Sequence, residues 1–207
     1  MKEFVHKNEV TLIGTAAAAP TVSHENHEAR FVKFPLRVLR LSGQADELTV
    51  MLPESLTERC RVEEGKRLCV VGQLRSYNNR SGSGRKLVLS VYARTLCCCE
   101  GEEDCNEILL AGAICKPPVG RSTPLGREIC DVLLAVNRRY GRADYIPCIA
   151  WGALAAEVGE REVGDTLAFR GRIQSREYRK TTPKGAEKRV AYEVSVMTLT
   201  EESGPEV

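Results

Sequence analysis

The sequence predicts an all-β protein made of two similar halves. Three observations carry this prediction: apolar and polar residues alternate over several short stretches, turn residues separate those stretches, and the whole pattern returns once along the chain. Side chains of a strand point to opposite faces with a period of two, so such alternation indicates strands with one buried face. The chain of 207 residues is long enough for two domains of ordinary size.

The internal repeat is the strongest of these observations. Residues of the first half return 98 to 103 positions later, in the same order and at nearly constant spacing. The repeated sets include Asn8-Glu9-Val10 with Asn106-Glu107-Ile108, Gly14 with Gly112, Arg40 with Arg138, Asp46 with Asp144, Gly65 with Gly164, and Gly72 with Gly171. We therefore expect domains at residues 1–97 and 106–200, joined by a short acidic linker with cysteines at 98–105 and followed by a short tail at 201–207.

Each half has the same expected order of elements. The sequence predicts a first strand at 10–14 and 108–112, a second at 31–39 and 128–137, and a third at 48–52 and 145–150. A short helix follows, after Pro53 in the first half, because proline suits a first helical position, and at 152–156 in the second. A fourth strand at 67–75 and 166–176 leads through a hairpin to a last strand at 86–96 and 189–199. Five strands with one short helix between the third and the fourth is the order of an OB-fold, although propensity alone also allows another small β-barrel.

The fourth strand of the second half continues into a basic hairpin. In this strand Leu167, Phe169, Gly171 and Ile173 alternate with Ala168, Arg170, Arg172 and Gln174, which predicts an apolar inner face and a cationic outer one. Residues 170–189 contain eight basic and two acidic side chains. A basic row with an aromatic set in it suits single-stranded nucleic acid, although a solvated loop has the same composition.

Aromatic residues are only 5% of the chain, so their positions are informative. OB-folds bind strands across their second and third strands and the flanking loops. The expected stacking residues are Tyr140, Tyr145, Trp151 and Tyr178, with Tyr77 on the hairpin of the first half. Tyr145 and Trp151 are six positions apart, so they share one face of a regular strand. The expected phosphate-binding residues are Arg138, Arg139, Arg172, Arg176, Arg179 and Lys180, with Arg75 in the first half. Any of these aromatics can instead be a core residue, and Trp151 is the most open to that alternative because it adjoins the helix.

The first half lacks the other aromatics. Ser42, Glu47 and Pro53 stand where the second half has Tyr140, Tyr145 and Trp151. We therefore expect a degenerate binding face in the first half and the main binding face in the second.

Composition narrows the class of protein further. The net charge is only +2, so any basic surface is local. No apolar run approaches the roughly 20 residues of a membrane span, and the N-terminus has no apolar signal core, so we expect a cytoplasmic protein whose nine cysteines are reduced thiols. Three adjacent cysteines, Cys97 to Cys99, do not have the paired spacing of a zinc site, so we expect no metal. Neither a phosphate-binding glycine loop nor a hydrolase motif is found, so we expect no enzyme and no cofactor.

The second half also resembles a known family. The segments NEILLAGAICKPP, RSTPLGREICDVLLAVNR, DYIPCIAWG and GRIQSREY look like a bacterial single-stranded DNA-binding protein over residues 106–200. The first half resembles it more weakly, through NEVTLIG, FPLRVLR, GQLRSYN and KLVLSVYARTL. The resemblance implies an OB-fold that stacks DNA bases on aromatics, with Tyr140, Tyr145, Trp151 and Tyr178 at the family's aromatic positions. It also implies that four OB domains assemble, so that a chain with two copies forms a homodimer.

We therefore expect a protein that binds single-stranded DNA without strong sequence preference and protects it in replication, recombination or repair, with replication or recombination proteins as further partners. The family's long tail with an acidic tip is replaced by residues 201–207, which favours an accessory or mobile-element role. Two alternatives stay open. One is an OB-fold protein–protein module, such as a primosome-like accessory factor, and the other is RNA binding, because an OB groove need not distinguish the sugars.

Overall fold

The computed structural model describes residues 6–26, 29–79, 87–138, 141–182 and 185–200. By their contacts these residues divide after Leu109 into two compact units. The N-terminal unit is Asn8–Leu109, and the C-terminal unit begins at Leu110 and includes the start of the chain up to Lys7. On this division the segment 98–105 belongs to the N-terminal unit, and the tail 201–207 lies outside the described residues. The domain bounds expected from the repeat stay a prediction.

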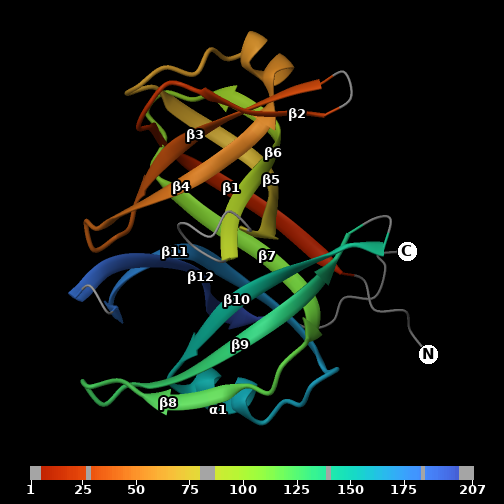
Figure 1. The fold of residues 1–207 in the computed structure, drawn as a ribbon, viewed down its shortest axis with the longest axis vertical. Helices are drawn as coiled ribbons and strands as arrows, with labels where there is room; N and C mark the ends of the chain where they lie inside the picture. Colours follow the sequence, from red (N-terminus) through yellow and green to blue (C-terminus); the bar gives the residue numbers. More distant parts are fainter. Residues whose placement is uncertain (1–5, 27–28, 80–86, 139–140, 183–184, 201–207) are drawn as a thin grey trace. The chain divides into compact units, whose positions relative to one another are not determined.

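The N-terminal unit is built mainly of strands (Figure 1). Its elements are β1 (Lys7–Ala16), β2 (Thr21–Asn26), β3 (Ala29–Leu39), β4 (Ala45–Pro53), the 3₁₀ helix η1 (Glu54–Glu58), β5 (Arg67–Asn78) and β6 (Leu87–Cys98). Neighbouring strands follow the order β2-β3-β4-β6-β5-β1, and β1 also pairs with β3, which closes five of the strands into a barrel. The β4–β6 pair is parallel, whereas the other pairs are antiparallel.

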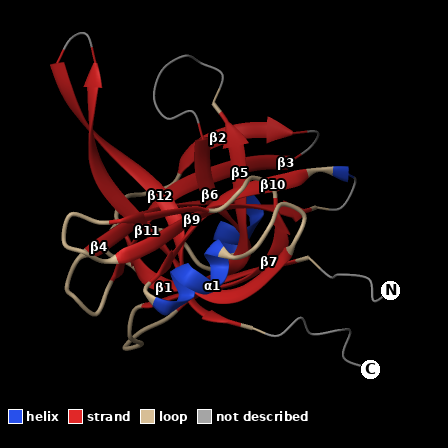
Figure 2. Cartoon of the chain, turned by 90° about the horizontal axis from the view of Figure 1, so that it is seen from below, coloured by secondary structure: helices blue, strands red, loops and turns tan. Residues whose placement is uncertain are grey.

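The C-terminal unit repeats this plan. Its elements are β7 (Cys105–Ile114), which begins before the division between the units, β8 (Val119–Ser122), β9 (Glu128–Asn137), β10 (Ala143–Trp151), the helix α1 (Ala153–Gly159), β11 (Thr166–Thr182) and β12 (Gly185–Leu199). The strand order is β8-β9-β10-β12-β11-β7, with β7 also paired to β9 and with β10 parallel to β12. Figure 2 shows α1 as the short helix of this unit, and it packs against β9 and β10. The all-β class and the OB-fold order are confirmed.

Alternation along the strands explains which side chains fill the barrels. In β11, Leu167, Phe169, Gly171 and Ile173 are buried and Arg170 is exposed, as the sequence predicts. Gln174, expected on the outer face, is instead buried, with a hydrogen bond to Glu193. The largest fully buried side chains of the N-terminal unit include Leu12, Phe34, Leu36, Leu52, Leu68 and Leu74. Those of the C-terminal unit include Leu110, Ile114, Leu134, Ile146 and Phe169. Burying such side chains removes apolar surface from water, which is the main favourable term in folding.

The repeated strand glycines lie where two strands approach closely. A Cβ atom added at these positions would lie 2.3 Å from Arg37 O at Gly14, 2.1 Å from Tyr92 O at Gly72, 2.7 Å from Ala135 O at Gly112, and 2.4 Å from Ser195 O at Gly171. Real Cβ atoms do not come this close to a carbonyl oxygen, so only glycine fits. The repeat of glycines therefore reflects the same close strand contacts in both barrels.

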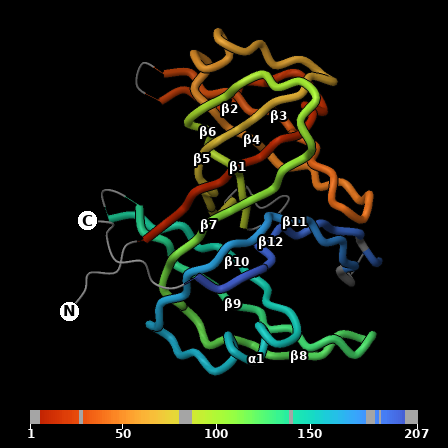
Figure 3. Tube along the Cα trace, turned by 180° about the vertical axis from the view of Figure 1, so that it is seen from behind, coloured from red at the N-terminus to blue at the C-terminus, as the bar shows by residue number. Residues whose placement is uncertain are grey.

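The structure adds two short strands where the sequence predicted loops. β2 pairs with β3 through Thr21↔Lys33 and His24↔Phe31, and β8 pairs with β9 through Val119↔Asp131 and Arg121↔Ile129. Both strands are short and pair with the strand that follows them in the chain, and the turn residues around them dominated the local signal. The hairpin of β11 and β12, drawn in blue in Figure 3, stays paired as far as Thr182↔Gly185.

The expectation that every cysteine is a reduced thiol is wrong for one pair. Cys60, which follows η1, and Cys98, at the end of β6, form a disulfide with their Cα atoms 5.7 Å apart. The two residues are 38 positions apart in the chain, so spacing alone does not reveal that they meet.

Within the described part of the chain, no helix has both the length and the apolar character needed to cross a bilayer.

Candidate nucleic-acid interface

The outward surface of β10 presents two aromatic side chains. Tyr145 pairs with Ala135 of β9 and Trp151 pairs with Ile129, in one unbroken antiparallel register. Because the two residues are an even number of positions apart, they point to the same face. The alternate residues Ile146 and Cys148 face the core and are buried. Tyr145 is exposed and Trp151 is half-buried, so the third strand carries its aromatics outward, as the sequence predicts.

The outward surface of β11 continues the same face. Ile149 of β10 pairs with Ser195 of β12, and Ser195 pairs with Arg172 of β11, although Ile149 and Ser195 themselves are buried. Directly paired residues of neighbouring strands share a face. Every second residue after Arg172 lies on that face, including Arg176 and Tyr178. We call the set Tyr145, Trp151, Arg172, Arg176 and Tyr178 the C-terminal face.

A buried carboxylate lies beneath the cations of the C-terminal face. Glu193 is only 6% exposed, and its Oε1 accepts a hydrogen bond of 3.3 Å from Nε2 of Gln174. Its Oε2 lies 3.7 Å from Nε of Arg176, whose guanidinium carbon is 5.9 Å from the centre of the Tyr178 ring. Glu193 therefore holds Arg176 beside the aromatic ring, in a cation–π geometry. The Nε of Arg172 is buried and has no hydrogen-bond partner among the described residues.

Two expected phosphate-binding residues occupy other places. Arg138 donates two hydrogen bonds to the buried carboxylate of Asp144, one of them 2.6 Å from Nε to Oδ2, so its guanidinium is engaged inside the unit. Arg179 is exposed, but it follows Tyr178 directly in β11, so the two side chains point to opposite faces of the hairpin. Tyr140 and Arg139 lie outside the described residues, as does the side chain of Lys180.

The expected residues of the N-terminal unit lie on the outer surface of β5. Tyr77 is 51% exposed, and the Arg75 guanidinium, two positions earlier on the same face, is 2.5 Å from Oε1 of Gln73. A second group of rings in this unit was not expected from the sequence. His24 stacks on Phe31 with ring centroids 4.8 Å apart and an interplanar angle of 4°, and Phe31 lies 6.1 Å from Tyr92. The aromatic character of positions 31 and 92 was the available signal.

The free thiols are not arranged as a metal site. Among the described residues, no group of three or more His, Cys, Asp or Glu side chains is placed to hold a metal ion. Burial raises the pKa of the Cys148 thiol far above its ordinary value, and the nearby Glu193 raises it further. Burial likewise raises the pKa of Cys69, Cys105 and Cys115. These thiols are therefore neutral at physiological pH and are poor ligands and nucleophiles.

Five strands closed in this order, with a short helix between the third and the fourth, define the OB-fold class, and the C-terminal unit adds aromatics and cations on one outward face. Residues 105–200 match the model of the Single-strand binding protein family. Single-stranded DNA-binding protein B of Bacillus subtilis is 34% identical over 80 residues, which cover 35% of this chain and 71% of that protein. The chain belongs to the single-strand binding protein family.

Further relatives agree with this assignment. Single-stranded DNA-binding protein 3 of Listeria innocua is also 34% identical over 80 residues, covering 35% of this chain and 50% of that protein. The chain thus spans about half the length of this curated relative. The crystal structure of the single-stranded DNA-binding protein from Thermus aquaticus superimposes with a TM-score of 0.78 at 24% identity, covering 98% of this chain and 96% of that one. This likeness shows the fold, and it extends over both units.

Proposed function

We propose that the chain binds single-stranded DNA without strong sequence preference, by stacking bases on Tyr145, Trp151 and Tyr178 and contacting phosphates through Arg172 and Arg176. The observation that carries the proposal is the strand register, which sets aromatics and cations on one outward face. Stacking contributes about 1–3 kcal/mol per base and tolerates any base, because every base has a flat face. Three such platforms with phosphate contacts are enough for useful affinity.

The family supports the wider role. Proteins that coat single strands protect them during replication, recombination or repair, and we propose the same for this chain. It acts as a binding protein rather than an enzyme, works in the cytoplasm, and forms a homodimer that brings four OB-folds together. Replication or recombination proteins are its further proposed partners. Sedimentation or light scattering of the full chain, with a mass of 22.9 kDa per subunit, tests the dimer.

Trp151 provides a direct test of the binding face, because it is the single tryptophan of the chain. Titrating the protein with oligothymidine should quench Trp151 fluorescence in a saturable way, since a stacked base quenches an indole. The same titration with duplex DNA should give little quenching, and a matched RNA oligomer measures the preference between sugars. Saturable binding by gel shift without any change in fluorescence would place the DNA elsewhere. Absence of binding in both assays would overturn the proposal.

A further inference from the structure

The outward face of the N-terminal unit carries rings from three different strands. His24 of β2 pairs with Phe31 of β3, and Phe31 pairs in turn with Pro53 of β4. Two positions earlier in β4, Met51 pairs with Tyr92 of β6. The registers and the ring distances place His24, Phe31 and Tyr92 together, and we call these three residues the N-terminal face.

A β-bulge is what brings His24 onto this face. Val22 pairs with Val32 and His24 pairs with Phe31, so Ser23 is an extra residue without a partner in the ladder. If the register were regular, Ser23 would lie opposite Phe31, and the His24 side chain would point to the other side of the strand. Bulges often re-aim a side chain in this way. The bulge at Ser23 therefore places the His24 ring against Phe31.

The N-terminal face is not a copy of the C-terminal face. At the corresponding place in β8 and β9, the regular pair Arg121↔Ile129 stands where His24↔Phe31 stands. Arg121 is engaged there by Asp131, with 2.6 Å between Nε and Oδ2. The family model covers residues 105–200, so it gives the rings of the N-terminal unit no role.

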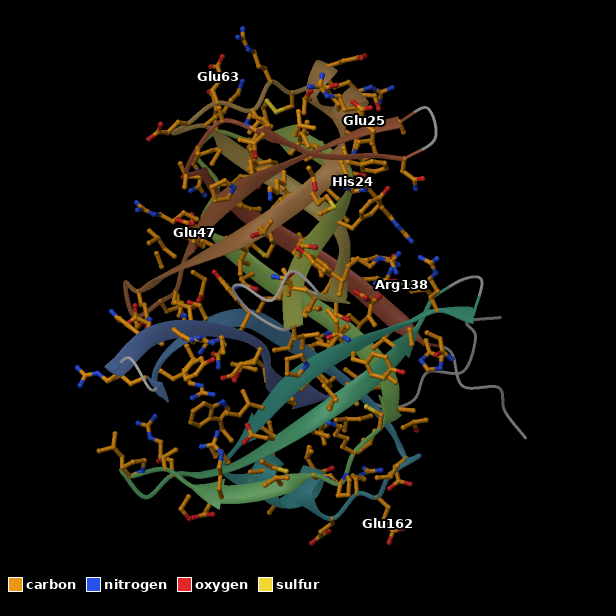
Figure 4. The ribbon with its side chains drawn as sticks, in the orientation of Figure 1. His24, Glu25, Glu47, Glu63, Arg138 and Glu162 are labelled. Carbon is orange, nitrogen blue, oxygen red and sulfur yellow. A yellow bond between two sulfur atoms is a disulfide. The ribbon has the colours of Figure 1, made fainter. Side chains whose placement is uncertain are left out.

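The charges around the N-terminal face do not oppose a polyanion. The acidic neighbours Glu25 and Glu54 both lie close to Arg30, at 4.0 and 3.6 Å. Lys33 is exposed and shares the outward side of β3 with Phe31, two positions away. Figure 4 labels His24 and Glu25 on β2. Lys33 therefore offers a cation on the side of the rings, and the carboxylates of Glu25 and Glu54 lie beside Arg30.

We infer that the N-terminal face is a second site for bases of single-stranded DNA, built on the His24–Phe31 stack with Tyr92 beside it. The choice of ligand rests on the proposed function, whereas the residues are different ones. His24 is exposed and already parallel to Phe31. A base that stacks on the open side of the imidazole extends an ordered pile of rings, so little side-chain ordering is needed on binding.

Photo-cross-linking of the full chain locates the bound bases. The probe is an oligothymidine with iodouracil substitutions, irradiated in complex with the protein, and the adducts are mapped by peptide mass spectrometry. Adducts on peptides containing His24, Phe31 or Tyr92, besides those of the C-terminal face, are the expected result. Adducts confined to the C-terminal face would overturn this inference and leave the proposed function intact. Failure of the oligomer to bind at all would overturn both.

A variant series measures the contribution of the site. In a chain that already carries Trp151→Ala and Tyr178→Ala, adding His24→Ser and Phe31→Leu should lower the remaining affinity about fivefold or more, because a stacking platform is lost. Phe31→Leu keeps an apolar side chain, which protects the fold. The matched control is Val22→Ser, a half-exposed residue of the same strand that points to the other side. Equal affinities in the variant and control chains would contradict the inference, and cross-linking in the unsubstituted chain stays decisive if a variant misfolds.

Discussion

The guanidinium of Arg138 holds the carboxylate of Asp144 through two hydrogen bonds, and the side chain of Asp144 is fully buried. Arg40 and Asp46 make the same contact in the N-terminal unit, at 2.7 and 2.6 Å. In each unit the pair spans the turn between the second and third barrel strands. The Arg and Asp that the repeat keeps six positions apart therefore encode a buried ion pair.

Asp144→Asn should destabilise the C-terminal unit by about 2–4 kcal/mol, because the guanidinium loses its charged partner in a largely buried setting. Denaturant unfolding followed by Trp151 fluorescence measures this, since that residue reports on the C-terminal unit alone. Asp131→Asn is the matched control: its pair with Arg121 is about 40% exposed, so the cost should stay within about 1 kcal/mol. Equal losses in the two variants would show that burial does not matter here.

Trp151→Ala combined with Tyr178→Ala should weaken binding to oligothymidine at least about 10-fold, since two stacking platforms are removed. Fluorescence anisotropy of a labelled oligomer measures the affinity, and circular dichroism checks that the barrel persists. Val163→Ala, an exposed apolar residue after α1, provides the control. Unchanged affinity in a folded double variant would remove the C-terminal face from the proposal.

Arg176→Gln should flatten the salt dependence of binding more than Arg179→Gln does. Each phosphate contact on a single strand contributes about 0.7 to the slope of log affinity against log salt. Arg176 lies on the face of Tyr178, whereas Arg179 points to the other side of the hairpin. Arg161→Gln, an exposed position after α1, should leave the slope unaltered. The reverse order of Arg176 and Arg179 would mean that the strand runs along the opposite side of the hairpin.

Gly171→Ala should cost about 1–3 kcal/mol in stability, because the new methyl group would lie 2.4 Å from Ser195 O and the strands must move apart. Gly120→Ala is a suitable comparison, since no atom lies within 4 Å of the added Cβ there. Thermal unfolding of the two variants gives the contrast. Similar melting temperatures would show that the β11–β12 contact gives way easily.

Cys97 should react with a thiol reagent near pH 8 while Cys148 does not. Cys97 is exposed, whereas burial raises the pKa of Cys148, so its thiol stays protonated and cannot act as the nucleophile. Mass spectrometry after brief alkylation of the native chain identifies the labelled sites. Cys97→Ser should remove the rapid label, and denaturant should expose Cys148. Rapid labelling of Cys148 in the folded chain would contradict its burial.

The strand order and much of the core could be predicted from the sequence because the same pattern of residues occurs in both halves of the chain. The repeated glycines mark close strand contacts, and the alternation in β11 assigns Leu167 and Phe169 to the core, where they lie. The Arg138–Asp144 pair was not foreseen, because a repeated charge looks the same whether it faces solvent or a buried partner. The Cys60–Cys98 disulfide was missed for a related reason: the two residues meet only once the barrel has closed.

The candidate site was predicted only in part. Strand parity correctly put Tyr145 and Trp151 on one side of β10, because that register is regular. The His24–Phe31 stack could not be predicted in this way. Strand alternation assigns every second residue to one face, and the β-bulge at Ser23 shifts that assignment by one residue. Comparing the two halves letter by letter also hid it, because the rings of the first half occupy positions that are not aromatic in the second.

The unpaired Ser23 has a consequence for how the two halves are compared with relatives. Gaining or losing one residue in β2 reverses the orientation of everything beyond it, whereas a substitution alters a single side chain. An insertion or deletion of one residue in this edge strand therefore changes which side chains are on the outward surface, while the five strands of the barrel are unaffected. In this segment, residues of related chains should therefore be aligned by the β3 residue with which they pair.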